Sequence, residues 1–189
     1  MTKEKLKTAP PNVRFLFQHP AHLFALGFGS GLSPVAPGTA GTLFAWASFH
    51  IISLLFNATG YPYILWPLAI TTSFLLGIWA CQVTAQNMHS QDPGSIVWDE
   101  IVAFWFVLFI VLRLIPSYAI EVQIAAFVFF RLFDMVKKGP VRWADERFAN
   151  SDYGYENALG IMLDDIVAAF LAIIVVCSTY FLFTLFSHA

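Results

Sequence analysis

The fold of this 189-residue chain is decided by the stretch Gly160-Ile161-Met162-Leu163-Asp164-Asp165-Ile166-Val167-Ala168-Ala169. Two adjacent carboxylates open the longest apolar run in the sequence, which extends from Ile166 to Phe186. A run of this length is about long enough to cross a lipid bilayer as a helix. Because a charge inside a membrane helix costs roughly 2.5–3.5 kcal/mol on insertion scales, an acidic pair at this place indicates a functional site. A plainer interpretation is that both acids occupy the first turn of a membrane helix, where the helix dipole favours negative charge.

The composition predicts a membrane protein. Hydrophobic residues make up 58% of the chain and charged residues only 12%, whereas soluble domains carry about 25% charged residues. A soluble domain of this length could not cover so much apolar surface. The net charge of −2 argues against a nucleic-acid partner. Cys81 and Cys177 lie within apolar runs, so we interpret them as small core residues rather than as a disulfide or a metal-binding pair.

Apolar segments predict an all-α, polytopic membrane helical bundle with about five membrane helices. The predicted segments are residues 40–57, 63–83, 101–112, 118–133 and 160–186. We expect residues 1–20 to form a flexible cytoplasmic arm and residues 21–189 to form a single membrane-embedded domain. His50 lies inside the first segment and is expected to be buried with its hydrogen bonds satisfied. Arg113 closes the third segment and is expected to extend its charge toward the membrane surface.

The segment 21–42 is rich in glycine and proline and too short in its apolar part to cross a membrane. Its helix-breaking residues are Gly27, Gly29, Gly31, Pro34, Pro37, Gly38 and Gly41. We predict a re-entrant or interfacial segment, which is tolerated where it lines a cavity or is buried in protein. Thr39 or Thr42 could cap the helix that follows. Glycine-rich backbone before a helix N-terminus can bind an anion, although a plain turn is an equally good interpretation.

Acidic residues also accompany the other apolar segments. Asp99 and Glu100 open the third segment, with Ser95 as a candidate N-cap, although first-turn acids that complement the helix dipole are again the plainer interpretation. Arg131 and Asp134 end the fourth segment and are three residues apart, so they share one helical face. A surface ion pair is the alternative interpretation of this last pair.

The distribution of basic residues predicts which side of the membrane these acids face. Of the ten lysines and arginines, four lie in the N-terminal arm, five lie between Arg131 and Arg147, and Arg113 lies alone. Cytoplasmic loops carry the excess of such residues, so the arm and the late loop are predicted to be cytoplasmic. Five spans would then place the loop at residues 84–98 on the same side. All the acidic stretches therefore meet at one cytoplasmic membrane surface.

Oxygen ligands and basic side chains gathered at a headgroup plane indicate phosphoryl chemistry on a lipid. The carboxylates are those of Asp99, Glu100, Asp134, Asp145, Asp164 and Asp165, and the basic residues are Arg131, Lys137, Lys138 and Arg142. Carboxylate ligation suits Mg²⁺, with Mn²⁺ possible, and arginine can bind phosphate through two hydrogen bonds. Two alternatives stay open, namely a small ion or proton transporter that uses membrane-embedded carboxylates and a non-catalytic lipid-binding scaffold.

At these residues the sequence resembles the phosphatidylglycerophosphatase A family. The matching stretches are Gly27-Phe28-Gly29-Ser30-Gly31-Leu32-Ser33-Pro34, Pro37-Gly38-Thr39, Gly94-Ser95-Ile96-Val97-Trp98-Asp99-Glu100, Phe130-Arg131 with Asp134, Pro140-Val141-Arg142-Trp143 with Asp145, and Gly160-Ile161-Met162 with Asp164-Asp165-Ile166-Val167-Ala168. They occur in the family's order and extend over nearly all of the chain after the arm. One departure is Lys138-Gly139-Pro140, where relatives often have Lys-Pro-x-Pro.

The resemblance implies a Mg²⁺-dependent phosphatase of the bacterial inner membrane. It would hydrolyse phosphatidylglycerophosphate in the cytoplasmic leaflet to phosphatidylglycerol and inorganic phosphate. Under this hypothesis the catalytic residues are Asp99, Glu100, Asp164 and Asp165, the metal ligands are these four with Asp134, and the substrate-binding residues are Arg131, Arg142, Lys137, Ser30 and Thr39. The nucleophile is either a water molecule or a carboxylate, and Glu100 could be the general base.

Overall fold

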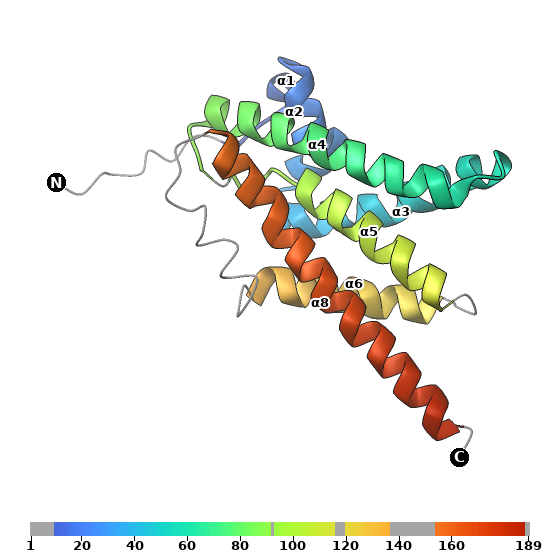
Figure 1. Ribbon diagram of the computed structural model, residues 1–189. Coiled ribbons are helices and arrows are strands. Elements are labelled where there is room, and N and C mark those ends of the chain that lie inside the picture. Colours follow the sequence, from blue (N-terminus) through green and yellow to red (C-terminus); the bar gives the residue numbers. More distant parts are fainter. Residues whose placement is uncertain (1–9, 92, 116–119, 137–153, 188–189) are drawn as a thin grey trace.

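The computed structural model describes residues 10–91, 93–115, 120–136 and 154–187, and these ranges contain helices and no strand. Three short elements come first, namely α1 (Val13–Leu16), α2 (Pro20–Ala25) and the 3-10 helix η1 (Gly27–Leu32). Five long helices follow: α3 (Pro37–Ala58), α4 (Pro62–Met88), α5 (Trp98–Leu114), α6 (Ile120–Val136) and α8 (Tyr155–Ser187). The all-α prediction is confirmed, and each predicted apolar segment coincides with one long helix (Figure 1).

The structure supports part of the predicted set of membrane-crossing helices. Within the described ranges, three helices are long and apolar enough to cross a membrane, namely α3, α4 and α8. Helices α5 and α6 have only 17 residues each, below the roughly 20 that a bilayer requires. The prediction of about five membrane helices is therefore not confirmed, and crossing by α5 and α6 stays a prediction.

Helix α5 occupies the centre of the bundle. It packs against α3, α4, α6 and α8, and Figure 1 shows it between α4 on one side and α6 and α8 on the other. Side chains are buried on all sides of this helix, from Trp98 at its first turn to Val111 near its end. Any polar residue in the first turn of α5 is therefore enclosed by neighbouring helices.

Proline, rather than a side-chain cap, starts two of the long helices. Pro37 and Pro62 occupy the first helical positions of α3 and α4, where the missing N–H costs nothing. The predicted caps were wrong: Ala36 precedes α3 and Val97 precedes α5, and neither makes a side-chain capping bond. Because α3 begins three residues earlier than predicted, Thr39 and Thr42 lie within it and cannot serve as its N-cap.

The glycine-rich segment docks on the first turn of α5. The Val97 N–H donates to the Ala25 carbonyl at 2.9 Å, and a Cβ on Gly31 would collide with the Ser95 carbonyl. Within η1 the backbone departs from helical geometry at Phe28 and Gly29, which both have positive φ. The sequence correctly predicted an irregular, glycine-dependent segment here, while its re-entrant placement in a membrane stays a prediction.

His22 anchors this segment from inside the protein. It is 2% exposed; its Nδ1 pairs with the Phe15 carbonyl at 2.9 Å and its Nε2 with the Asn87 side-chain amide at 2.8 Å. An amide N–H donates to Nε2, so these partners assign the neutral ring with its proton on Nδ1. Burial lowers the pKa of His22, partly offset by the bond to the Phe15 carbonyl.

Two further predictions about single residues have mixed outcomes. His50 was expected to be buried, but it is exposed on α3, although its Nε2 is satisfied by Gln123 Oε1 at 2.7 Å. Cys81 is fully buried as expected, whereas Cys177 is half-buried. Neither cysteine forms a disulfide.

Candidate active site

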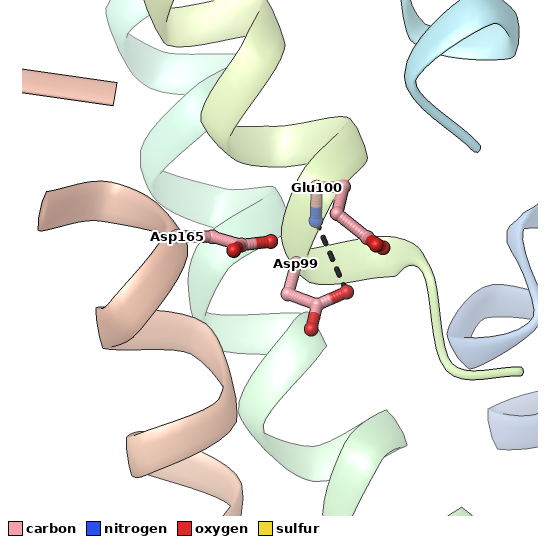
Figure 2. Close-up of side chains that lie close together, drawn as sticks. All are labelled: Asp99, Glu100 and Asp165. Carbon is pink, nitrogen blue, oxygen red and sulfur yellow. Dashed lines mark hydrogen bonds between the residues drawn. The ribbon is translucent and has the colours of Figure 1, made fainter. Parts of the chain in front are cut away.

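Three carboxylates from two helices converge beside the first turn of α5. Asp99 and Glu100 come from α5, Asp165 comes from α8, and one oxygen from each lies within 4.8 Å of the others (Figure 2). Glu100 and Asp165 are 9% and 3% exposed, while Asp99 is half-buried. Asp99 Oδ1 also accepts the Glu100 backbone N–H at 3.0 Å. Residues 65 positions apart in the chain thus form a single acidic cluster.

Close helix packing brings Asp165 to this position. Ile161, Asp165, Ala168 and Ala172 are all buried along one face of α8, with the three-to-four-residue spacing that a helix face requires. Small residues on that face allow α8 to lie directly against α5. Gly77 allows α4 to approach α8 and α5 closely, because its Cα faces the side chains of Met162 on α8 and Trp98 on α5.

Arg131 on α6 extends the cluster. Its Nη1 lies 2.8 Å from Asp134 Oδ2 and 3.4 Å from Glu100 Oε1. The same nitrogen donates to Thr42 Oγ1 on α3 at 3.3 Å. The shared helical face predicted for Arg131 and Asp134 is confirmed. The ion pair that was the alternative interpretation is present, but it is largely buried and belongs to the acidic cluster rather than to the surface. Asp134 is also near enough to Asp165 to interact with it.

Two contributions from α3 were missed by sequence reasoning. The Cα of Gly38 approaches Glu100 and Arg131 so closely that a Cβ there would overlap Glu100 Oε1. Thr42, one turn later, is fully buried, donates to the Gly38 carbonyl at 2.9 Å and accepts from Arg131. The signal that could have found them is the spacing of small residues along one helix face, which permits helices to approach closely.

The charges of this cluster do not balance among the described residues. The cluster contains four carboxyl groups, those of Asp99, Glu100, Asp134 and Asp165, and one guanidinium, that of Arg131, which pairs with Glu100 and Asp134. Within the described ranges, Glu100 Oε2, Asp165 Oδ2 and Arg131 Nε are buried without a hydrogen-bond partner. Buried charges and polar atoms of this kind are normally compensated by a ligand or a counter-ion. The donor set consists of oxygens alone, which fits a hard divalent cation.

The remaining predicted site residues are placed in different ways. Asp164 is buried beside the cluster, and its Oδ1 accepts the Asp165 backbone N–H at 3.0 Å, but it is not one of the three converging carboxylates. Ser30 Oγ donates to the Gly27 carbonyl at 2.8 Å within η1. Thr39 is half-buried in the first turn of α3. Lys137, Lys138, Arg142 and Asp145 lie outside the described residues. The roles predicted for all of these residues stay predictions.

Comparison with known proteins identifies the family of the chain. The family model for phosphatidylglycerophosphatase A matches residues 23–180, which include every residue of the acidic cluster. The chain belongs to the phosphatidylglycerophosphatase A family. Membership makes it a phosphatase enzyme, and it confirms the resemblance seen in the sequence. No solved structure matches the chain.

The relatives cover most of the chain. A protein from Haemophilus influenzae named phosphatidylglycerophosphatase A is 44% identical over 158 residues, which cover 84% of this chain and 87% of its own. A protein from Escherichia coli with the same name is 39% identical over 155 residues, covering 82% and 80% respectively. A protein from Bacteroides thetaiotaomicron is 35% identical over 166 residues, covering 82% and 89%, and it carries a provisional name as a phosphatidylinositol-3-phosphatase.

Proposed function

We propose that this phosphatase hydrolyses the terminal phosphate monoester of phosphatidylglycerophosphate. Water is consumed, the bond between phosphorus and the glycerol oxygen breaks, and phosphatidylglycerol and inorganic phosphate are released. The two relatives of 39% and 44% identity carry the name of this activity. The observation that carries the proposal is the convergence of Asp99, Glu100 and Asp165 next to Arg131, since this arrangement combines metal-type ligands with a phosphate-binding cation.

The acidic cluster is proposed to hold one or two Mg²⁺ ions, with Mn²⁺ as a substitute. Asp99, Glu100 and Asp165 would supply the first ligands, and Asp134 and Asp164 would supply further ligands or hydrogen bonds to them. When bound, such an ion neutralises phosphate charge and lowers the pKa of a coordinated water. The orphaned oxygens of Glu100 and Asp165 support this assignment, because each is buried and has no partner among the described residues.

The protein's own side chains are proposed to bind and orient the phosphate. Arg131 Nε–H is buried and unpartnered among the described residues, so it is available to donate to a phosphate oxygen and to stabilise charge that develops during transfer. Thr42 and Asp134 hold the guanidinium in place for this task. Glu100 is a candidate general base, because its Oε2 makes no hydrogen bond to the described residues. Arg142, Lys137, Ser30 and Thr39 remain proposed contacts to the substrate.

The site is proposed to face the cytoplasmic leaflet of the bacterial inner membrane. In the described part of the chain, three helices are apolar and long enough to cross a membrane. Nine of the ten lysines and arginines lie in the N-terminal arm or between Arg131 and Arg147, and cytoplasmic segments carry the excess of such residues. The alternative of an ion or proton transporter is not favoured, because the relatives are named as phosphatases. Its distinguishing result would be ion flux into proteoliposomes without phosphate release.

Phosphate release from purified protein tests the proposed activity. Protein in detergent or nanodiscs should release phosphate from phosphatidylglycerophosphate, lose this activity in EDTA and regain it with added Mg²⁺. Asp165→Asn should abolish turnover, whereas Glu156→Gln, an exposed acid in the first turn of the same helix, serves as the matched control and should retain it. Phosphatidylinositol 3-phosphate should be included as a competing substrate, given the name of the third relative. Turnover by Asp165→Asn equal to that of the control would reject the assigned site.

A further inference from the structure

A cavity lies at the end of the bundle opposite to the acidic cluster. It has a volume of about 300 Å³ and is lined by residues from the end of α3, the start of α4 and the end of α5. Glu100 and Arg113 are 13 residues apart on α5, which corresponds to about 20 Å along a helix. The cavity is therefore separate from the acidic cluster and lies toward the C-terminal ends of α3 and α5.

Arg113 is the single charged side chain among the described residues that line this cavity. Its guanidinium lies 4.4 Å from the centre of the Tyr63 ring, and it forms no ion pair with any carboxylate in the described part of the chain. An aromatic face holds a guanidinium in position but leaves its N–H donors free. The donors of Arg113 are thus positioned and available for an anionic ligand.

The walls of the cavity combine aromatic surface with neutral hydrogen-bonding groups. Phe49 and Trp66 are buried and stack at 4.2 Å between ring centres. Trp66 Nε1 donates to Ser53 Oγ at 3.2 Å, so the Ser53 hydroxyl hydrogen remains available to donate. The exposed Asn57 adds a side-chain amide at the rim. An apolar floor with a few convergent donors is the usual construction of a small-ligand site.

We propose that this cavity binds a phosphate oxyanion, carried by the headgroup of an anionic phospholipid. Arg113 would supply the charge and the paired donors, with Ser53 and Asn57 as neutral donors. Tyr61, Tyr63 and Trp66 cluster at this end of the bundle, and tyrosine and tryptophan concentrate at the level of lipid headgroups. A volume of about 300 Å³ suits a headgroup rather than a whole lipid, whose chains would lie along the outer surface of the helices.

Native mass spectrometry of the full chain in non-ionic detergent tests this site. Phosphatidylglycerol and phosphatidylcholine are titrated separately against wild type, Arg113→Gln, Asn57→Ala and the charge-matched control Arg14→Gln, in which Arg14 lies on α1 near the far end of α4. We expect wild type and Arg14→Gln to bind one phosphatidylglycerol in addition to any that the acidic cluster binds as product. Arg113→Gln should bind this additional lipid about tenfold more weakly, because hydrogen bonds to a charged group contribute about a factor of ten or more to affinity. Phosphatidylcholine binding should not change, and neither should phosphate release from phosphatidylglycerophosphate.

A second arm identifies the source of the phosphate. Inorganic phosphate is added to delipidated protein, and the thermal midpoint is measured for the same variants. If phosphate raises the thermal midpoint of wild type but not of Arg113→Gln, and the two proteins bind lipid equally, the ligand of the cavity is free phosphate rather than a lipid headgroup. Equal behaviour of wild type, Arg113→Gln and Asn57→Ala in both arms overturns the proposal, as does an equal loss in Arg113→Gln and Arg14→Gln. Asn57→Ala changes only an exposed side chain, so its result stands even if Arg113→Gln folds poorly.

Discussion

Replacing Gly38 with alanine tests whether the close approach of α3 to the acidic cluster matters for turnover. A Cβ at this position overlaps Glu100 Oε1 and lies 2.9 Å from the Arg131 guanidinium. Relief of the overlap requires the carboxylate to move by on the order of 1 Å, and a misplacement of that size can cost about 100-fold in rate. We therefore expect kcat for phosphate release from phosphatidylglycerophosphate to fall about 100-fold in Gly38→Ala.

The Gly38→Ala variant should still fold, so the loss is attributable to geometry. Alanine gains about 1 kcal/mol of helix propensity over glycine, while overpacking costs roughly 1–3 kcal/mol. The net destabilisation of about 0–2 kcal/mol corresponds to a fall in thermal midpoint of no more than about 8 °C. Gly94→Ala is the matched control, because nothing lies within 4 Å of its Cβ position just before α5. A folded Gly38→Ala enzyme with the kcat of Gly94→Ala would refute the reasoning.

Three further predictions concern Thr42, His22 and Gly77. Thr42→Val removes a hydrogen-bond acceptor of Arg131, so kcat/KM should fall about tenfold; unchanged kinetics would show that the guanidinium is held by its carboxylates alone. Because burial lowers the pKa of His22, the unfolded chain takes up a proton as pH falls through about 6.5 while the folded chain does not. Thermal midpoints should therefore drop below that pH in wild type and drop less in His22→Gln. Gly77→Ala places a Cβ 2.7 Å from the Met162 side chain. It should lower the thermal midpoint by several degrees, at a net cost of about 1–2 kcal/mol. A thermal midpoint equal to that of wild type would contradict tight packing of α4 at this position.

The sequence predicted the helices well because their apolar runs are long and are bounded by proline and glycine. It also predicted that Arg131 and Asp134 share one helical face, since a spacing of three residues places two side chains on the same side of a helix. It could not predict which of Asp164 and Asp165 joins Asp99. Helix α8 is apolar on all sides, so its core-facing side is set by contacts with α5 and α6 rather than by a hydrophobic pattern.

The sequence placed the start of α3 three residues too late, and the cause of this error also bears on the site. Gly38 and Gly41 were interpreted as part of an irregular segment, because glycine usually interrupts a helix. The structure begins α3 at Pro37, so both glycines are helical, and with Thr42 and Ala45 they form a buried face of small residues. Each glycine costs the helix about 1 kcal/mol relative to alanine. That cost is understandable at Gly38, where a larger residue would displace Glu100, and at Gly41, where it would collide with Val97 before α5. The glycine-rich stretch is therefore best explained by the assembly of the acidic cluster, with the close approach of α3 to α5 as its physical requirement.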